Sequence, residues 1–282
     1  MSCNILLKSY YISNTYLWIG LCMRNSFFSV ILSSLLLLIS SFSFASEQTY
    51  VVGAGGTYRP FEYENSDKQL EGFDIDLIKA IAEVQNFNIK LINTPWEGIF
   101  ATLDNGERDI IISGITITDK RKNSVDFSLP YFPAEQVIVS QKSTEIKSIN
   151  DLSSHTVGVV NGSTADVVVS KVLGKNSTAI KRFDNTPLLL QELYEEGISA
   201  AVGDVGVVKF YIKMHPGKDF NLVYDDTFES QYFGIAVAKG NSELRNSINE
   251  GLKKIVANGT YASIYKKWFD SNVPSLPLDS KE

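Results

Sequence analysis

Apolar residues recur at the spacing of amphipathic helices in several stretches of the chain. The clearest stretch is 74–85, where Asp74 is a candidate N-cap and the apolar positions fall on one face. The same reasoning predicts helices over 97–104, 165–173 and 188–196. The apolar face of helix 74–85 consists of Leu77, Ile78, Ile81, Ala82 and Val84.

Short apolar runs between these helices predict strands. They cover 49–54, 88–92, 109–115 and 198–202, and the run at 109–115 is typical of a strand that is buried on both faces. Since helices and strands alternate along the chain, the pattern indicates an α/β fold.

The two halves of the chain follow a similar plan. In each half a Thr-Pro pair opens a helix that ends near a Gly and leads into a strand, over 94–113 and again over 186–202. This plan favours two α/β lobes. The β-rich runs 136–140 and 233–238 could then cross between the lobes, so that the chain begins in the first lobe, builds the second and returns. Ligands of such folds bind in the cleft between the lobes.

The first 45 residues have a different composition. They contain no acidic residue, and an apolar, Ser-rich stretch over 27–45 follows Arg24 and ends in small residues. Residues 1–45 are therefore predicted to be a secretory signal peptide. Their apolar core is too short for a transmembrane anchor, which needs about 20 predominantly apolar residues. Translation could also begin at Met23.

Charge and cysteine content narrow the class of protein. The 282 residues carry a formal net charge of −6, which becomes −8 when Lys8 and Arg24 are removed with the leader. This acidic balance argues against nucleic acid as the main partner. Cys3 and Cys22 also lie in the leader, so the exported chain is expected to have no disulfide, no cysteine zinc site and no lipid anchor. Two histidines alone are too few for a histidine-rich metal site.

The segment 113–121 combines the end of a buried strand with polar groups. Gly114 ends the strand, Thr116 offers a hydroxyl, and Thr118 can cap a short helix that follows. Arg121, in the first turn of that helix, offers a bidentate fork for a carboxylate. The alternative for this basic run is a solvated surface.

Two further elements suit the charges of a small molecule. Residues 161–164 precede the helix 165–173, whose free N–H groups attract a carboxylate. Asp204 follows the strand 198–202 and could pair with an ammonium group or cap the next helix. Together with Arg121, these elements form the complement of a zwitterion.

These residues make the chain resemble the family 3 periplasmic solute-binding proteins, the polar amino-acid receptors of ABC importers. The resemblance covers residues 48–270 and is greatest to members that bind glutamine, arginine or other basic amino acids. The motifs that carry it are Pro60-Phe61-Glu62, Gly72-Phe73-Asp74-Ile75-Asp76-Leu77, Gly114-Ile115-Thr116-Ile117-Thr118 with Arg121, Asp126-Phe127-Ser128 with Pro130-Tyr131, and Asn258-Gly259-Thr260-Tyr261 with Lys266-Lys267-Trp268-Phe269.

The resemblance implies a two-lobe periplasmic binding protein fold of type II. In this α/β fold two crossing strands join the lobes, and the ligand binds in the cleft between them. The first lobe is expected to comprise 46–136 plus 232–282, and the second lobe 137–231. In similar proteins the lobes close on the ligand.

The resemblance also implies a set of ligand contacts. In similar proteins, the positions that match Arg121, Thr116 and Thr164 bind the α-carboxylate. Those that match Gly114, Thr116 and Asp204 bind the α-ammonium group. The expected ligand-binding residues are Tyr58, Trp96, Ser113, Gly114, Thr116, Arg121, Gln136, Thr164 and Asp204.

The expected pocket for the ligand side chain departs from the family pattern at two positions. Tyr58 and Trp96 match the aromatic positions that sandwich the side chain. Gly55, however, stands where many relatives that select glutamine or basic side chains carry Asp. Val160 stands where the glutamine receptor has Lys, so both departures weaken a glutamine assignment.

The expected function is that of the periplasmic substrate-binding component of an amino-acid ABC transporter. It would bind a polar or basic L-amino acid (arginine, lysine, histidine or glutamine) and deliver it to an inner-membrane permease. Glu135 and Gln136, near the first crossing strand, could reach a cationic tip. No catalysis, cofactor, metal or nucleic acid is expected, and the protein is expected to be a monomer.

Two alternative functions use the same fold. Some periplasmic cyclohexadienyl dehydratases share it, and they need a cleft carboxylic acid for proton transfer, for which Glu135 is the nearest candidate. Similar domains also sense ligands in signalling proteins, but the chain ends at Glu282, so signalling would require a separate partner.

Overall fold

The computed structural model describes residues 48–279. The predicted signal peptide, residues 1–45, and the alternative start at Met23 lie outside these residues. Within 48–279, none of the helices combines the length and the apolar content that a membrane crossing requires.

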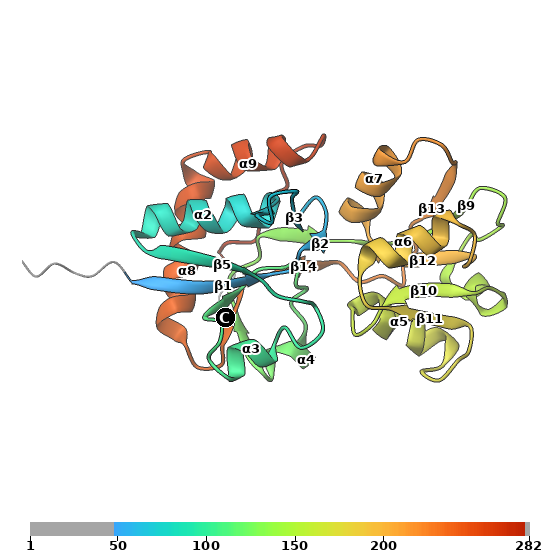
Figure 1. Ribbon diagram of the computed structural model, residues 1–282, viewed down its shortest axis with the longest axis horizontal. Coiled ribbons are helices and arrows are strands. Elements are labelled where there is room, and N and C mark those ends of the chain that lie inside the picture. The colour runs from blue at the N-terminus through green and yellow to red at the C-terminus, as the bar shows by residue number, and fades with distance from the viewer. Residues whose placement is uncertain (1–47, 280–282) are drawn as a thin grey trace, which may run out of the picture. The chain divides into compact units, whose positions relative to one another are not determined.

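The first of two five-stranded sheets has the strand order β5-β1-β6-β15-β7 (Figure 1). Strand β1 pairs in parallel with β5 and β6, whereas β15 runs antiparallel to β6 and β7. The last strand of the chain therefore returns to the sheet that the first strand begins. The strands of this sheet are β1 (Thr49–Ala54), β5 (Asn88–Asn93), β6 (Ile110–Ile111), β7 (Val125–Phe127) and β15 (Ala236–Ala238).

The second sheet repeats this plan with the order β11-β10-β12-β9-β13. Strand β10 is parallel to β11 and β12, and β9 is antiparallel to β12 and β13. The two-lobe α/β architecture predicted from the sequence is therefore confirmed, with one sheet in each lobe. The strands of this second sheet are β9 (Gln136–Gln141), β10 (Val157–Val160), β11 (Ile180–Phe183), β12 (Ala200–Asp204) and β13 (Phe220–Val223).

Helices surround each sheet and bury their apolar faces (Figure 1). In α2, the predicted apolar positions Leu77, Ile78 and Ile81 are completely buried, and each such side chain contributes about 1.5–3 kcal/mol. The helices of the first lobe are α2 (Phe73–Gln85), α3 (Ala101–Asp104), α4 (Asp119–Lys122), α8 (Ser242–Ala257) and α9 (Thr260–Trp268). Those of the second lobe are the 3₁₀ helix η1 (Ile149–Ser154), α5 (Thr164–Leu173), α6 (Thr186–Tyr194) and α7 (Val205–Met214).

The chain passes between the lobes twice, along an antiparallel pair formed by β8 and β14. Strand β8 (Phe132–Ala134) leads into β9 of the second sheet, and β14 (Gln231–Phe233) leads into β15 of the first. Of the two runs predicted as crossings, 136–140 lies in β9 and 233–238 leads from the end of β14 into β15, so the crossings lie mainly just before these runs. A further small sheet beside the first lobe contains β2 (Thr57–Tyr58), β3 (Glu62–Glu64) and β4 (Leu70–Glu71).

A cluster of aromatic rings packs where the crossing strands meet the first lobe. The ring of Phe61 lies 4.8 Å from that of Phe132, 5.3 Å from Phe233 and 5.4 Å from Phe269, measured between centroids. Aromatic pairs at such distances contribute about 0.5–1.5 kcal/mol each beyond their buried area. This cluster fixes the β2–β3 turn, which carries residues of the site described below.

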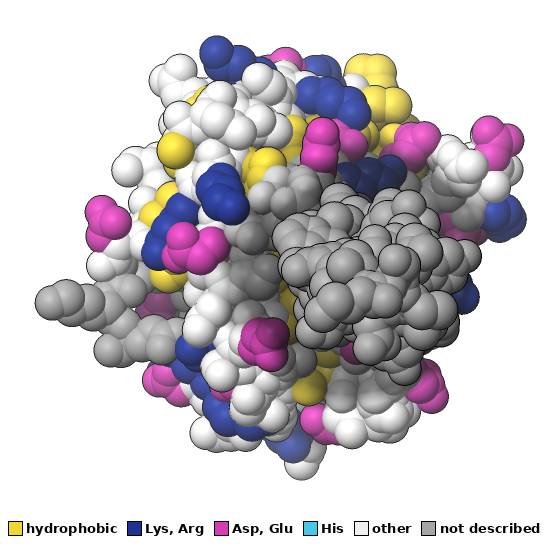
Figure 2. All heavy atoms as spheres, turned by 90° about the vertical axis from the view of Figure 1, so that its left-hand side faces the viewer, with side chains coloured by type: hydrophobic (Ala, Val, Ile, Leu, Met, Phe, Trp, Pro, Cys, Tyr) yellow, Lys and Arg dark blue, Asp and Glu magenta, His cyan; other side chains and the backbone are white. Residues whose placement is uncertain are grey.

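Charged side chains of both signs are mixed on the surface. Figure 2 shows one face of the first lobe, where basic and acidic side chains are interspersed. Ion pairs such as that of Lys253 with Glu250, at 3.0 Å, join exposed side chains and contribute at most about 1 kcal/mol each. The fold therefore depends on its apolar cores more than on surface charge.

The structure corrects two local predictions. The helix predicted over 97–104 is regular only in α3, because Gly98 has φ +77 and turns the backbone out of the helical region. Asp74 is not an N-cap, since α2 begins at Phe73 after Gly72 and no side chain caps it. The carboxylate of Asp74 instead accepts a hydrogen bond from the backbone N–H of Gly114 at 2.9 Å.

Candidate functional site

A cavity of about 380 Å³ lies between the ends of the two sheets. Residues of both lobes line it, including the end of β12 and the turns before α4 and α5. Of the predicted site residues, Gln136 lies outside the lining. Those that line the cavity are Tyr58, Trp96, Ser113, Gly114, Thr116, Arg121, Thr164 and Asp204.

Arg121 is the basic group of this cavity. It lies in α4, and the side chain of Thr118 caps this helix by accepting a hydrogen bond from the backbone N–H of Arg121, as predicted. Its Nη1 donates to the carbonyl of Thr116 at 2.9 Å, and no carboxylate among residues 48–279 lies within ion-pair distance. Burial lowers the pKa of Arg121 to about 10, while the charge of Asp204 acts in the opposite direction.

Asp204 brings a negative charge from the second lobe. Tyr58 donates its phenolic hydrogen to Asp204 Oδ2, while Oδ1 is buried with no hydrogen-bond partner in the described chain. The side chain does not cap α7, which excludes the simpler role that the sequence left open. Burial raises the pKa of Asp204 to about 6, although the bond from Tyr58 and the charge of Arg121 oppose this rise.

The strand predicted over 109–115 ends at Ile111, and the loop that follows it, 113–116, brings the backbone close to the cavity. Gly114 has φ +51, and a Cβ there would lie 2.6 Å from the ring of Tyr58. Only glycine fits this left-handed conformation and close contact. Thr116 is buried at 3% exposure, so its hydroxyl and carbonyl are held in place beside Arg121.

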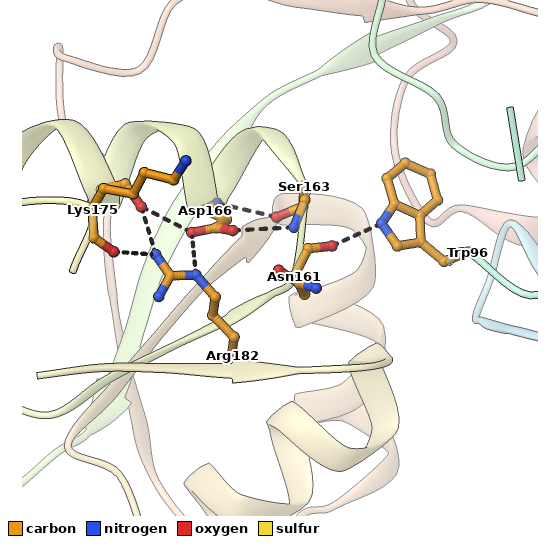
Figure 3. Close-up of polar contacts among 8 residues, drawn as sticks. Trp96, Asn161, Ser163, Asp166, Lys175 and Arg182 are labelled. Carbon is orange, nitrogen blue, oxygen red and sulfur yellow. Dashed lines mark hydrogen bonds and ion pairs between the residues drawn. The ribbon is translucent and has the colours of Figure 1, made fainter. Parts of the chain in front are cut away.

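The turn before α5 supplies further polar groups of the second lobe (Figure 3). Ser163 caps α5 by accepting from the N–H of Asp166. Asp166 Oδ2 accepts from the N–H of Gly162 at 3.1 Å, and its Oδ1 forms an ion pair with Arg182 Nε at 3.0 Å. The Thr164 hydroxyl accepts from Gln136 Nε2 at 2.5 Å, so Gln136 contacts the lining without being part of it.

Trp96 belongs to the first lobe and forms a hydrogen bond to the second. Its indole Nε1 donates to the carbonyl of Asn161 at 3.0 Å, as Figure 3 shows. The guanidinium of Arg121 lies 5.2 Å from the Trp96 ring, within cation–π range. The hydrogen bond from Trp96 to Asn161 and the one from Tyr58 to Asp204 join the first lobe to the second directly beside the cavity.

Sequence reasoning missed Glu62 as a site residue. Its side chain is fully buried and lines the cavity, and Oε1 accepts from the Ser113 hydroxyl at 2.6 Å. Burial raises the pKa of Glu62 well above its usual range, and the charge of Asp74 adds to this rise. The only sequence signal was its place in the motif Pro60-Phe61-Glu62.

The structure does not support a role for Glu135 in the cavity. Its side chain is exposed and is not part of the lining, and its carbonyl accepts from the N–H of Val205 at 2.8 Å. Val160 does line the cavity. The other apolar residues that the second lobe adds to the lining are Ala165, Leu189, Leu190, Ala201, Val202, Val207 and Val208.

The charges that line the cavity suit a small molecule. Across the described residues, no three carboxylate, histidine or cysteine side chains are grouped so that they could hold a metal. Arg121 and Asp204 present opposite charges to one cavity. The fold and this cavity define a two-lobe binding protein for a small charged ligand.

The chain belongs to the bacterial extracellular solute-binding proteins, family 3, whose sequence pattern matches residues 50–271. It is 41% identical over 223 residues to a probable histidine-binding protein of Neisseria gonorrhoeae, which covers 79% of this chain and 83% of the relative. It is 31% identical over 237 residues to an L-arginine-binding protein of Pseudomonas aeruginosa, covering 82% of this chain and 92% of that protein.

A solved structure with a similar fold is that of the arginine-, lysine-, histidine-binding protein ArtJ from Geobacillus stearothermophilus. It superposes with a TM-score of 0.78 at 38% sequence identity, covering 83% of this chain and 100% of ArtJ. Both the family and the two-lobe fold inferred from the motifs are therefore confirmed.

Proposed function

We propose that this protein is the substrate-binding component of an amino-acid ABC transporter and that its ligand is a basic L-amino acid: arginine, lysine or histidine. It acts in the periplasm as a monomer without a lipid anchor and delivers the ligand to an inner-membrane permease. The observation that carries the proposal is the buried carboxyl of Glu62, on the wall of the cavity that also holds Arg121 and Asp204.

Arg121 and Asp204 account for the two charges of the amino-acid backbone. The guanidinium nitrogens of Arg121 that do not bind Thr116 are available for a bidentate bond to the α-carboxylate. The buried Oδ1 of Asp204 needs a donor, and an α-ammonium group provides one while Tyr58 keeps its bond to Oδ2.

Glu62 accounts for a positive charge on the ligand side chain. A Cβ at Gly55 would lie 3.5 Å from Glu62 Oε1, so Glu62 brings an acid to the space beside the position where many similar proteins carry Asp. The rings of Tyr58 and Trp96 can add about 0.5–2 kcal/mol each to a cation that they face. The side chain of Val160 is apolar and cannot form a hydrogen bond with the neutral side-chain amide of a glutamine ligand.

The relatives support a basic ligand, since they are named as histidine- and arginine-binding proteins. We infer that the lobes comprise 46–136 plus 232–282 and 137–231, and that they close because the ligand contacts both. No catalytic step is proposed, because Glu135, the acid considered for a dehydratase, lies outside the cavity lining.

A calorimetric titration with amino acids and matched analogues tests the proposal. Arginine, lysine or histidine should bind, and ligand at about 100 times Kd should stabilise the protein by about 2.7 kcal/mol in thermal unfolding. Citrulline, which is arginine without its side-chain charge, should bind about 10- to 100-fold more weakly, since a hydrogen bond to a charged group contributes about 1.5–3 kcal/mol. Agmatine, which lacks the α-carboxylate, should not bind measurably.

Two results would contradict this function. Equal affinity for arginine and citrulline would remove the argument from Glu62, and failure of every basic amino acid to bind would exclude the ligand class. Incubation with prephenate and arogenate, monitored for product, tests the dehydratase alternative, and turnover of either compound would replace the proposal by an enzyme.

A further inference from the structure

Glu62, on the wall of the cavity, and Asp74 lie next to each other, and neither forms an ion pair with a basic residue of the described chain. Consecutive residues hold them, because the Ser113 hydroxyl bonds to Glu62 Oε1 at 2.6 Å and the Gly114 N–H bonds to Asp74 Oδ2 at 2.9 Å. Both side chains are completely buried. The phenolic group of Tyr131 also donates to Asp74 Oδ2, at 2.9 Å.

The remaining oxygen of each carboxyl has no donor when both groups are ionised. These atoms are Glu62 Oε2 and Asp74 Oδ1, and both are buried. Two ionised carboxylates in such a site would each leave a charged oxygen unpaired, which is costly in a low-dielectric interior. One proton on Glu62 gives both oxygens a partner, because the new O–H can donate to Asp74.

The electrostatics of the pair support this arrangement. Burial raises the pKa of both carboxyls, that of Asp74 to about 6 and that of Glu62 well above its usual range. Asp74 accepts two hydrogen bonds, from Gly114 and Tyr131, whereas Glu62 accepts one, from Ser113, so the negative charge is better stabilised on Asp74 and Glu62 is the donor. The other titratable groups that face the pair are the phenols of Tyr58, Tyr131 and Tyr261.

We propose that Glu62 and Asp74 share one proton in the ligand-free protein, and that the cationic end of the ligand displaces it. The second half of this inference depends on the proposed function. On binding, the O–H bond of Glu62 breaks and its proton leaves to the solvent. The carboxylate then accepts a hydrogen bond from the ligand's guanidinium, ammonium or imidazolium group, while Asp74 keeps its bonds from Gly114 and Tyr131.

This exchange makes the pair a determinant of specificity. A neutral amino acid cannot replace the proton, because it brings no positive charge to compensate a second buried carboxylate. A cationic ligand can, so its binding releases a proton near neutral pH and its affinity rises with pH until Glu62 is ionised in the free protein.

Infrared difference spectroscopy on the ligand-free protein tests the shared proton without any ligand. The wild-type protein should show the carbonyl stretch of a protonated carboxyl near neutral pH, and Glu62→Gln should lack it. Glu64→Gln serves as the control, because Glu64 lies two residues away and pairs with Lys68. Absence of this band from the wild-type protein would overturn the shared proton.

Titration in buffers with different ionisation enthalpies counts the protons released. Arginine should release about one proton per molecule from the wild-type protein, whereas citrulline should release none. Asp74→Asn should still bind arginine without this release, because the amide can donate to Glu62 and keep it ionised while its oxygen still accepts from Gly114 and Tyr131. A merely structural role for Asp74 would leave proton release unchanged, and that result, or arginine binding without release in the wild-type protein, would overturn the displacement.

The two experiments separate this inference from the proposed function. If the infrared band is present but no basic amino acid binds, the shared proton stands, whereas the displacement and the proposed function both fail. If arginine binds and the band is absent, the proposed function stands and the shared proton is wrong.

Discussion

The two lobes contain sheets of the same strand order, but they bring different chemistry to the cavity. The first lobe supplies Arg121, Glu62 and the loop 113–116 after β6, and these groups are held by hydrogen bonds within that lobe. The second lobe supplies a largely apolar wall with Asp204 and the exposed Asp184, and the side chain of Asp204 accepts a hydrogen bond from Tyr58 of the first lobe.

This difference separates recognition from closure. Polar groups that are already fixed in place lose little entropy when a ligand arrives, so the first lobe is suited to bind and orient it. An apolar wall contributes by excluding water, which strengthens the electrostatic contacts inside. The second lobe therefore adds affinity mainly when it covers a ligand that the first lobe has already oriented.

The largest effect is expected from Arg121→Ala, which removes the basic group of the first lobe. A buried α-carboxylate would then lack its partner, and losing one member of a buried charge pair costs about 3–5 kcal/mol. Calorimetry with arginine should detect no binding in the range accessible to the wild-type protein. Lys120→Ala, at an exposed neighbouring position, should bind normally, and near-normal affinity of Arg121→Ala would remove the recognition role of this lobe.

Asp204→Asn tests the carboxylate that the second lobe places beside Tyr58, and its effect should be smaller. The amide oxygen can still accept from the ligand's ammonium group while the amide NH2 donates to the hydroxyl oxygen of Tyr58, so the loss is that of one charged hydrogen bond, about 1.5–3 kcal/mol. We expect an increase in Kd of about 10- to 100-fold, measured by calorimetry, with Asp219→Asn on the surface of the same lobe as the control. A loss as large as that of Arg121→Ala would mean that the lobes share recognition equally.

The pH dependence of affinity follows from the raised pKa of Asp204, about 6 in the empty protein. Its ionised form binds an ammonium group, so protonation below this pH should weaken ligand binding by up to about tenfold per pH unit. Titrations between neutral pH and pH 5 check this. In Asp204→Asn the affinity should depend less steeply on pH, because one titrating group is missing. Identical profiles for the two proteins would assign the dependence to other groups.

The same raised pKa makes the stability of the fold change with pH in the opposite direction to the affinity. The folded empty protein holds this proton more tightly than the unfolded chain does, so the contribution of Asp204 to stability is present at low pH and is lost as the pH rises through about 6. A bound ammonium group removes that loss, so ligand should stabilise the fold more above this pH than below it.

The smallest effect is expected from Trp96→Phe, which keeps an aromatic ring but removes the indole bond to the Asn161 carbonyl. One neutral hydrogen bond contributes about 0.5–1.5 kcal/mol, so Kd should rise by about two- to tenfold. Surface plasmon resonance should place this change in the dissociation rate, since the contact holds the lobes together after binding. A change confined to the association rate would show that Trp96 guides the ligand in instead.

The sequence predicted the elements with a strong pattern and missed those set by distant contacts. Helix α2 and strands β1 and β5 were found because their apolar positions repeat along many residues. Helix 97–104 was overestimated, since one left-handed glycine, Gly98, interrupts it. Whether a glycine adopts such a φ depends on the surrounding fold, and local spacing does not reveal it.

The site residues also divide into those that the local sequence pattern predicted and those that depend on distant contacts. Thr116 and Arg121 follow strand β6, and Asp204 ends strand β12, on the side where the pattern itself predicts a cleft, and the structure brings all three to one cavity. Glu62 was missed because an acid in a short strand is ordinarily solvated, and its partner Ser113 lies 51 residues away. Glu135 was considered because it adjoins a crossing strand, but its backbone position turns the side chain outward.

The hydrogen bonds from Tyr58 to Asp204 and from Trp96 to Asn161 join the two walls of the cavity. Both must break before the walls can separate, so they contribute to a first-order opening step ahead of ligand release. The dissociation rate of every ligand should then be limited by this opening rate, whatever its side chain. The time for which an amino acid stays bound would in that case depend partly on two bonds within the protein itself.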